Sequence, residues 1–258
     1  MASSCGAWTR RSTSDRFRLR VQVRRTCPRD VEKWVQVRRT CPRDVLRCAA
    51  AALSFLFLPG VVSAQHHFRA EVFGGAAWSV PTTLTIDQSD LERLSVDAEW
   101  ETRPFDSPPY YAARIGLWKE GRGWELQLLH HKLYLADPPP EIEHFEISHG
   151  WNFLTLQRAS RTRVVDWRVG AGPVITHVEG RIRGRGADPE GGLFGAGYHV
   201  SGAALLAGAG RSFAISRAFF ASAEAQVTLS WARVPIQTGH ARTANAAFHV
   251  LLGLGFGL

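Results

Sequence analysis

The feature that most constrains this chain is an alternation of apolar and polar side chains with a period of two. It is clearest in Phe219–Trp231, where every second residue is apolar and the residues between them are mainly polar. The same period in Leu94–Trp100 gives one apolar and one acidic face. Because successive side chains of a β-strand point to opposite faces, this pattern predicts strands.

The length of these strands indicates a membrane. Strands of soluble proteins usually have about 5–6 residues, whereas a tilted membrane-spanning strand has about 9–11 in hydrocarbon. After residue 65 the sequence has no run of about 18 apolar residues, so no transmembrane helix is predicted there. We therefore expect an all-β fold, an antiparallel up-and-down transmembrane β-barrel.

The strand count depends on one short segment. The expected strands are His67–Ser79, Leu94–Thr102, Tyr110–Lys119, Gly123–Leu135, Ile142–Leu156, Arg163–Val178, Tyr198–Ser212, Phe219–Trp231 and Ala244–Leu258. This number is odd, and bacterial single-chain barrels have even numbers. A short strand at Thr83–Asp87 gives ten strands, which we favour. Placing Leu94–Thr102 in an extracellular hairpin gives eight.

The predicted connections alternate in length. Lys119–Arg122, Gln157–Thr162 and Phe213–Ala218 are short, whereas Glu179–Gly197 and Ala232–Thr243 are longer and rich in Gly, Arg or Pro. Short periplasmic turns and long extracellular loops are typical of outer-membrane barrels. Counting back from the C-terminus places the long loops outside the cell.

The N-terminal region divides into two segments. Residues 1–44 form a basic leader in which the eleven-residue sequence VQVRRTCPRDV begins twice, at Val21–Val31 and at Val35–Val45, the second copy ending one residue beyond it. We expect this basic leader to be disordered, or translated from sequence ahead of the true start. Residues 45–64 follow with an apolar run and the small residues Val62-Ser63-Ala64, the pattern of a secretory signal peptide cleaved after Ala64. Residues 65–258 would then form the barrel in the bacterial outer membrane.

The excess of positive charge and all the cysteines lie in residues 1–64. Residues 1–64 hold 13 basic and 4 acidic residues, a net charge of +9, which leaves residues 65–258 with 18 basic and 19 acidic residues and a net charge of −1, so no nucleic-acid partner is expected for the barrel. All cysteines, Cys5, Cys27, Cys41 and Cys48, precede residue 50. The barrel segment therefore has neither a disulfide framework nor a thiolate metal site.

The C-terminal sequence AFHVLLGLGFGL carries a resemblance to a known superfamily. Its alternate apolar residues are Phe248, Val250, Leu252, Leu254, Phe256 and Leu258. With the signal peptide and the alternating strands, it resembles the outer-membrane β-barrel superfamily, in particular small barrels of the OmpA and OmpW type. The commonest pattern ends in an aromatic residue, and here the last residue is Leu258.

That resemblance implies several partners. The barrel assembly machinery and periplasmic chaperones would handle the chain in transit, and outer-membrane lipid or lipopolysaccharide would surround it. No cofactor is implied. Five tryptophans lie near predicted strand ends, where aromatic girdles are expected: Trp78, Trp100, Trp124, Trp151 and Trp231.

The segment EIEHFEISHGWNF, Glu141–Phe153, contains histidine, serine and acidic residues that suggest catalysis. On a regular strand, Phe145, Ile147, His149, Trp151 and Phe153 share the face expected to contact lipid, and His144, Glu146, Ser148, Gly150 and Asn152 share the lumen face. Ser148 and His149 would then lie on opposite sides of the wall and could pair only through a bulge. Lipid A 3-O-deacylases place His and Ser two apart before Asn, a spacing that Ser148-His149 does not match. No catalytic residue is predicted.

A second segment, ELQLLHHKLYL, changes phase near Leu129, which indicates a β-bulge. Glu125 and Gln127 are expected to face inward, and Leu133 and Leu135 to take the outward face. His130 and His131 could offer metal ligands with His144, but they lack a fixed spacing and no metal site is predicted.

We expect charged side chains to line the lumen and to pair there, because an unpaired charge in a narrow barrel is costly. The inward positions are Arg69, Glu71, Asp97, Glu99, Glu101, Arg114, Glu125, His144, Glu146, Asp166, Arg168, His199, Glu224 and His249. The candidate polar cluster is Glu125, Gln127, His130, Lys132, His144, Glu146, Ser148, Asn152, Asp166 and Arg168. The expected function is that of a largely non-porous barrel with a structural or ligand- or lipid-binding role. A lipid-modifying hydrolase and a narrow solute channel are the alternatives.

Overall fold

A computed structural model describes residues 67–258. The leader, the signal peptide and the cleavage site lie outside these residues. Within the described part, all regular structure is β-strand, and no helix there is long and apolar enough to cross a membrane.

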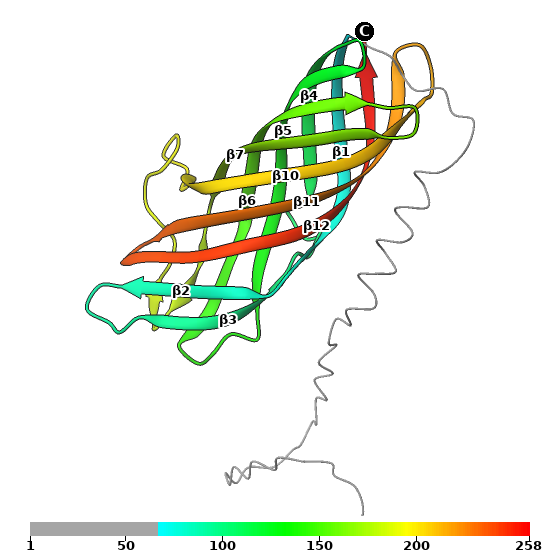
Figure 1. Cartoon of the computed structure of the whole chain (residues 1–258). Helices are drawn as coiled ribbons and strands as arrows, with labels where there is room; N and C mark the ends of the chain where they lie inside the picture. Colours follow the sequence, from blue (N-terminus) through cyan, green and yellow to red (C-terminus); the bar gives the residue numbers. More distant parts are fainter. Residues whose placement is uncertain (1–66) are drawn as a thin grey trace, which may run out of the picture. The chain divides into compact units, whose positions relative to one another are not determined.

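Eight antiparallel strands close into a ring (Figure 1). In order around the ring they are β1 (Phe68–Ser79), β4 (Tyr111–Lys119), β5 (Arg122–Ala136), β6 (Ile142–Arg161), β7 (Asp166–Thr176), β10 (His199–Ala214), β11 (Phe219–Ile236) and β12 (Gly239–Gly257). The pairing of β12 with β1, from Arg69 opposite Gly257 to Ser79 opposite Ala247, closes the barrel. The predicted all-β barrel and its strands are therefore observed.

The favoured count of ten is wrong for the ring. Both short strands exist, β2 (Thr82–Gln88) and β3 (Leu94–Glu101), but they form a hairpin that extends β1 and β4 at one end. β2 follows β1 along β12, and β3 precedes β4 along β5. Each of these two barrel strands is thus split, by residues 80–81 and by residues 102–110. The alternation of apolar and polar residues alone could not show this, because the two parts of each split strand alternate equally well.

The wall is also taller than predicted at the end that carries β2 and β3. β11 and β12 continue through the predicted loop Ala232–Thr243, pairing as far as Ile236 opposite Gly239. Part of the predicted loop Glu179–Gly197 forms β8 (Glu179–Ile182) and β9 (Arg185–Gly186), with β8 paired to β6. The 18 residues of β11 span about 60 Å, whereas the apolar band of an outer-membrane barrel is about 25 Å tall.

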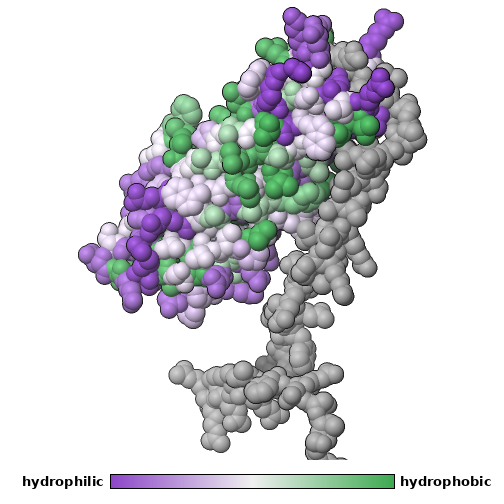
Figure 2. Space-filling model, viewed as in Figure 1, coloured by the Kyte–Doolittle hydropathy of each residue, from purple (hydrophilic) through white to green (hydrophobic). Residues whose placement is uncertain are grey.

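Two halves of the barrel differ in which face is apolar. In what we term the belt half, the outward side chains are apolar and exposed, including Val72, Leu117, Trp124, Leu156, Trp167, Val169, Leu205, Val227, Trp231, Leu252 and Leu254. In the distal half, formed by β2, β3, β8 and the adjoining ends of β5, β6, β7, β11 and β12, the apolar side chains point inward. Figure 2 shows hydrophobic surface over the middle of the barrel and mainly polar surface at the end that carries β2 and β3.

The buried core of the distal half has the character of a soluble β-barrel. Its side chains include Leu84, Ile86, Trp100, Leu133, Leu135, Phe145, Ile147, Trp151, Phe153, Val174, Ile182, Val234 and Ile236. Burying a large apolar side chain stabilises a fold by about 1.5–3 kcal/mol. This half therefore holds its shape through hydrophobic packing above the belt.

This core corrects several expected orientations. Phe145, Ile147, Trp151 and Phe153 were expected to face lipid, yet each is at most 2% exposed and lies inside. Leu133 and Leu135 also face inward, where the outward face was predicted. The outward apolar side chains of the wall form the belt, and these residues lie beyond it, where the apolar face points inward.

The tryptophans divide in the same way. Trp124 and Trp231 are more than half exposed, as expected of girdle residues, and Trp78 lies beside Phe248 with ring centroids 6.2 Å apart. Trp100 and Trp151 are buried in the distal core, which corrects their expected place in a girdle.

Candidate functional site

The interior of the belt half is filled by a charged network centred on Arg114. Its Nη2 donates to Glu224 Oε2 at 2.9 Å, and its Nε donates to Glu71 Oε2 at 3.1 Å. Nη1 donates to Gln127 Oε1 at 3.1 Å. The guanidinium therefore ties together β1, β4, β5 and β11 across the inside of the barrel.

A second arginine completes the network. Arg168 Nε donates to Glu125 Oε2 at 2.7 Å, and Arg168 Nη1 lies 3.1 Å from Glu224 Oε2. Trp118 Nε1 donates to Glu125 Oε1 at 2.9 Å. Arg69 pairs with Glu71 at 3.2 Å, and Arg161 pairs with Asp166 at 3.1 Å.

We name the charged members of this network the plug: Arg69, Glu71, Arg114, Glu125, Arg161, Asp166, Arg168 and Glu224. It has four cationic and four anionic groups, so its formal charge is zero. Paired charges of this kind are the arrangement that a narrow, closed interior requires, because removing one partner leaves a buried charge uncompensated.

A series of hydrogen-bonded aromatic and polar side chains lies between the plug and the distal core. Tyr110 Oη is 2.9 Å from His249 Nδ1, and His249 Nε2 is 2.8 Å from Thr228 Oγ1. His131, which also lies inside, has its Nε2 3.2 Å from Ser79 Oγ. These groups form the transition from the polar plug to the apolar distal core.

The outer wall of the distal half is distorted by a bulge in β6. β5 advances from His131 to Leu133 while β6 passes from Trp151 to Ile147, so Ser148, His149 and Gly150 lie opposite the single residue Lys132. Gly150 has a φ of 138°, and a Cβ there would overlap the Asn152 side chain. The bulge predicted near Leu129 of β5 is therefore not observed there: β5 keeps one alternation, with Gln127, Leu129 and His131 all buried, and the irregularity lies in β6.

The bulge brings Ser148 and His149 together, the arrangement that a regular strand forbids. Ser148 Oγ is 3.4 Å from His149 Nδ1. Glu179 Oε1 contacts that same Nδ1. In a serine–histidine–acid triad the serine and the acid contact opposite ring nitrogens. Because both groups converge on one nitrogen and Ser148 is only 3% exposed, this group lacks the geometry of a triad.

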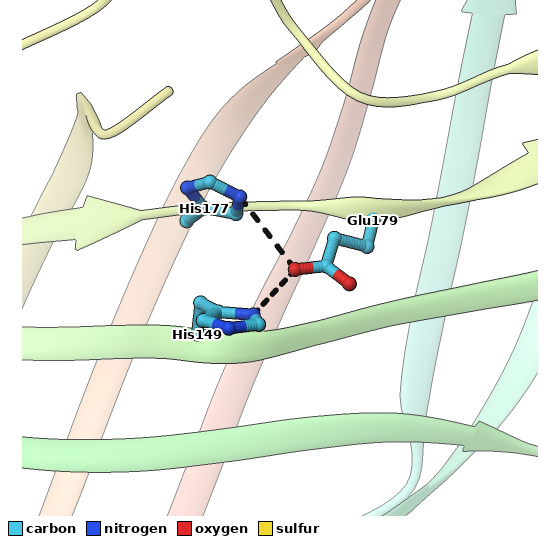
Figure 3. A group of neighbouring side chains, drawn as sticks. All are labelled: His149, His177 and Glu179. Carbon is cyan, nitrogen blue, oxygen red and sulfur yellow. Dashed lines mark ion pairs between the residues drawn. The ribbon is translucent and has the colours of Figure 1, made fainter. Parts of the chain in front are cut away.

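Three potential metal ligands meet on the outer face beside the bulge. His149 on β6, His177 after β7 and Glu179 at the start of β8 point toward one another (Figure 3). Glu179 Oε1 contacts His149 Nδ1 and lies 3.6 Å from His177 Nε2. His177 Nδ1 is 3.1 Å from the carbonyl oxygen of Ala196. The Tyr198 ring packs 4.9 Å from the His177 ring, and burial raises the pKa of Tyr198.

A basic group lies on the outer face of β11 and β12, just beyond Trp231. Arg233 is directly opposite Arg242 in the ladder. Asp87 accepts hydrogen bonds from Arg242 at 2.5 Å and from Arg93 at 2.6 Å. The bond from Arg93 is the main reason why the pKa of Asp87 is below its usual range. Burial is the main cause of a lowered pKa at His240, which lies beside Asp87.

The residues of the predicted polar cluster fall in two separate places. Glu125, Gln127, Asp166 and Arg168 lie buried in the belt half. The other six lie higher, around the bulge and on the outer face: His130, Lys132, His144, Glu146, Ser148 and Asn152. The structure therefore does not bring the ten residues into one lumen.

Contacts of these six residues explain their positions. His130 Nδ1 lies 2.7 Å from Asn152 Oδ1, and its ring stacks on Tyr111. Lys132 Nζ donates to the carbonyl oxygen of Asp106 at 2.9 Å. His144 is exposed and lies 2.9 Å from Glu146. The inward orientation expected for His144 is therefore not observed, and Asp97, Glu99 and Glu101 are also exposed.

Sequence reasoning missed His177 and Glu179 entirely. They lie within predicted segments of a strand end and a loop, 28 and 30 residues after His149, and no local spacing connects them. Contacts between distant segments bring them beside His149: the backbone N–H of His177 donates to the carbonyl oxygen of Gly150, and β8 pairs with β6.

Comparisons with known proteins bear on the fold alone. No protein-family model and no curated protein matches the sequence. Similar solved structures include Neisserial surface protein A, NspA (11% identical, TM-score 0.37, covering 74% of this chain and 97% of NspA). Others are OprG from Pseudomonas aeruginosa (8% identical, TM-score 0.39, covering 76% and 98%) and Ail of Yersinia pestis (9% identical, TM-score 0.36, covering 74% and 99%).

The structure itself gives a closed ring of eight antiparallel strands with an apolar outer belt and charges inside it, which is the arrangement that a membrane-spanning β-barrel requires. The chain is therefore a small closed β-barrel with an apolar outer belt.

Proposed function

We propose that the protein is a non-conducting outer-membrane barrel that holds a rigid β-structure above the lipid surface, where it contacts anionic lipid headgroups. The observation that carries the proposal is the inversion along β11. Outward residues are apolar from Phe219 to Trp231, and the next outward residue is Arg233. Inward residues change at the same height, from Ser230 to Ala232, Val234 and Ile236.

The filled interior argues against the channel alternative. A solute would have to pass the plug in the belt half and then the packed side chains of the distal half. Arg114 alone reaches two carboxylates and a glutamine on three other strands. Breaking a buried ion pair by removing a partner costs about 3–5 kcal/mol, so spontaneous opening is unfavourable.

The position of Arg233 and Arg242 argues for headgroup contact. Like charges directly opposite one another weaken a sheet, so their pairing needs a compensating anion. Asp87 bonds Arg242 and Arg93, which leaves this group with more basic than acidic side chains. One step above a tryptophan at the edge of an apolar belt, such a group lies at the height of lipid phosphates. Lipopolysaccharide is the anionic lipid we propose.

The proposal includes the expected route to this membrane. The chain would be exported, cleaved after Ala64, carried by periplasmic chaperones and inserted by the barrel assembly machinery. N-terminal sequencing of protein recovered from envelopes should then begin at Gln65. Recovery of residues 1–64 on the mature protein would contradict this route.

The direct test measures association with lipopolysaccharide. The purified protein would be titrated with lipopolysaccharide in mild detergent and binding followed by native mass spectrometry. We expect an Arg233→Gln, Arg242→Gln double variant to bind at least several-fold more weakly, since each basic side chain near an anionic surface contributes about 1 kcal/mol. Arg217→Gln, in the exposed turn at the opposite end, is the matched control and should bind as the wild type does. Equal binding by all three proteins would contradict the headgroup contact.

Conductance gives a second, independent test. Planar bilayers containing the wild-type protein should show no steady channel current, because the plug spans the barrel. A stable, ion-selective current from the unmodified protein would favour the channel alternative.

A further inference from the structure

We infer that the distal half binds a divalent transition-metal ion, with Zn²⁺ the best fit, between His149, His177 and Glu179. One potential ligand atom from each residue lies within 4.8 Å of those of the other two. Figure 3 shows both imidazole rings directed at the same carboxylate oxygen. The inference does not depend on the proposed lipid contact.

The hydrogen bonding of His177 points to a cation in this place. The carbonyl oxygen of Ala196 can only accept, so Nδ1 of His177, 3.1 Å away, carries the hydrogen. In a neutral ring Nε2 then presents a lone pair, and it faces Glu179 Oε1 at 3.6 Å. Two acceptors that face each other repel unless a cation or a proton lies between them. A bound metal ion is such a cation, and a second proton on His177 is the competing explanation.

This bond is also the outer contact that metal-binding histidines typically make. Such a histidine usually donates its second ring N–H to a carbonyl or carboxylate, which sets the tautomer and orients the ring. Gly197 adds to the support, because a Cβ there would lie 2.8 Å from His177 Cε1. The loop after β9 is therefore packed closely against the ring that would bind the ion.

The donor set selects the type of metal. Two imidazoles and one carboxylate suit Zn²⁺ and similar transition-metal ions, whereas Ca²⁺ and Mg²⁺ prefer oxygen ligands throughout. The side chains of His149 and Glu179 are 46% and 33% exposed, so a fourth position is open to solvent. An ion bound here would have three protein ligands and one exchangeable ligand.

The site is distinct from the other histidine–carboxylate pairs on the outer face. His144 lies 2.9 Å from Glu146, and His240 lies 3.1 Å from Asp87, but each pair has a single imidazole. Among residues 67–258, the group at the bulge is the one in which three potential ligands converge. Its ligands come from β6, from β8 and from the segment between β7 and β8, which the β6 bulge and the β6–β8 ladder hold together.

The test is a zinc titration of the untagged protein, purified from membranes in detergent and stripped with a chelator. Isothermal titration with ZnCl₂ should show one ion bound per chain. His149→Gln, His177→Gln and Glu179→Gln should each lower the affinity by at least about tenfold, since even outer-shell partners contribute about 10–100-fold. His240→Gln removes an imidazole beside a carboxylate elsewhere on the outer face, and should leave the affinity unchanged.

A spectroscopic measurement confirms the ligands. Co²⁺ in place of Zn²⁺ should give visible absorption bands of a four-coordinate site in the wild type and in His240→Gln, and not in the three ligand variants. Heat-modifiable gel mobility would show that each variant is folded. No stoichiometric Zn²⁺ binding by the wild type, or unchanged affinity in all three folded ligand variants, would overturn the inference.

Discussion

The two halves of β11 use the same alternation for opposite purposes. Between Phe219 and Trp231 the outward side chains are apolar and inward Glu224 and Gln226 bind other polar groups. Beyond Trp231 the outward Arg233 is exposed and the inward Val234 and Ile236 are buried. No break in the ladder with β12 accompanies the change. One continuous strand can therefore suit an apolar environment along one part and water along the next. The backbone pairing stays the same, and only the types of residue on the outward and inward faces change.

The halves also differ in how their interiors are stabilised. The belt half depends on charges that satisfy one another, and the distal half depends on apolar packing. Loss of one plug member leaves partners charged and buried, whereas loss of one methyl group from the distal core leaves only a small cavity. Substitutions in the two halves should therefore have effects of different size.

The largest effect is expected from Arg114→Ala. Glu71 and Glu224 would each lose a charged partner inside the barrel, so the free energy of unfolding should fall by about 3–5 kcal/mol. Urea unfolding in detergent, followed by gel mobility, would measure the change. Arg217→Ala, in an exposed turn, is the control and should unfold as the wild type does. Equal stability of the two variants would show that the plug does not support the belt half.

A charge placed on the belt should have the next largest effect. Val227→Arg puts a guanidinium on the outward face near the middle of the apolar stretch, which costs about 2–4 kcal/mol at the centre of a bilayer. Folding efficiency into lipid vesicles would measure it. Arg233 is a natural arginine on the same face of the same strand, so Arg233→Val is the matched reverse change and should fold normally. If Val227→Arg folds as well as the wild type, the belt does not face lipid.

A smaller effect is expected in the distal core. Ile147 is fully buried, and Ile147→Val removes one methylene group and should cost about 0.5–1.5 kcal/mol. Leu205→Val makes the same reduction on the exposed belt, where no cavity forms, and should cost less in the same thermal unfolding assay. Ile147→Val should therefore lower the stability more than Leu205→Val does. A larger loss for Leu205→Val would contradict the inward placement of Ile147.

The smallest effect is expected at Ser148. Its Oγ has one side-chain partner, His149 Nδ1, at 3.4 Å, so Ser148→Ala should cost about 1 kcal/mol or less. Lipid profiles of envelopes from the variant and wild-type strains should be identical, because Ser148 lacks a triad geometry. Specific loss of a deacylated lipid in the variant would show that Ser148 is a nucleophile.

Much of the fold could be predicted from the sequence, because alternation is a local property. The positions of the ring strands, though not the extra length of β11 and β12, and the outward face of Phe248–Phe256 required only the period of two. Whether an apolar side chain points outward or inward could not be predicted from the period alone. It also depends on whether the residue lies within the apolar belt or beyond it. Phe153 and Leu156 on β6 illustrate this: Phe153 is buried inside and Leu156 is exposed outside, yet both are apolar.

The candidate sites were harder to predict, because they depend on contacts between distant segments. Seven of the eight plug residues were predicted as inward charges, since they lie where the simple alternation holds; Arg161 was placed in the predicted turn Gln157–Thr162 and was missed. His177 and Glu179 join His149 through the pairing of β6 with β7 and β8 and through the irregular stretch of β6, in which Ser148, His149 and Gly150 lie opposite one residue of β5. No pattern within one strand contains that information.

The inversion at Trp231 can be tested most directly by spin-label accessibility along β11. The native cysteines all precede residue 50, so single cysteines at positions 223–236 of the protein folded in lipid vesicles would carry the label without competition from the barrel. We predict that outward positions up to 231 are accessible to oxygen, that 233 and 235 are accessible to a water-soluble nickel complex, and that 232, 234 and 236 are protected from both. Oxygen accessibility that continues through 233 and 235, or water accessibility at 234 and 236, would contradict the inversion.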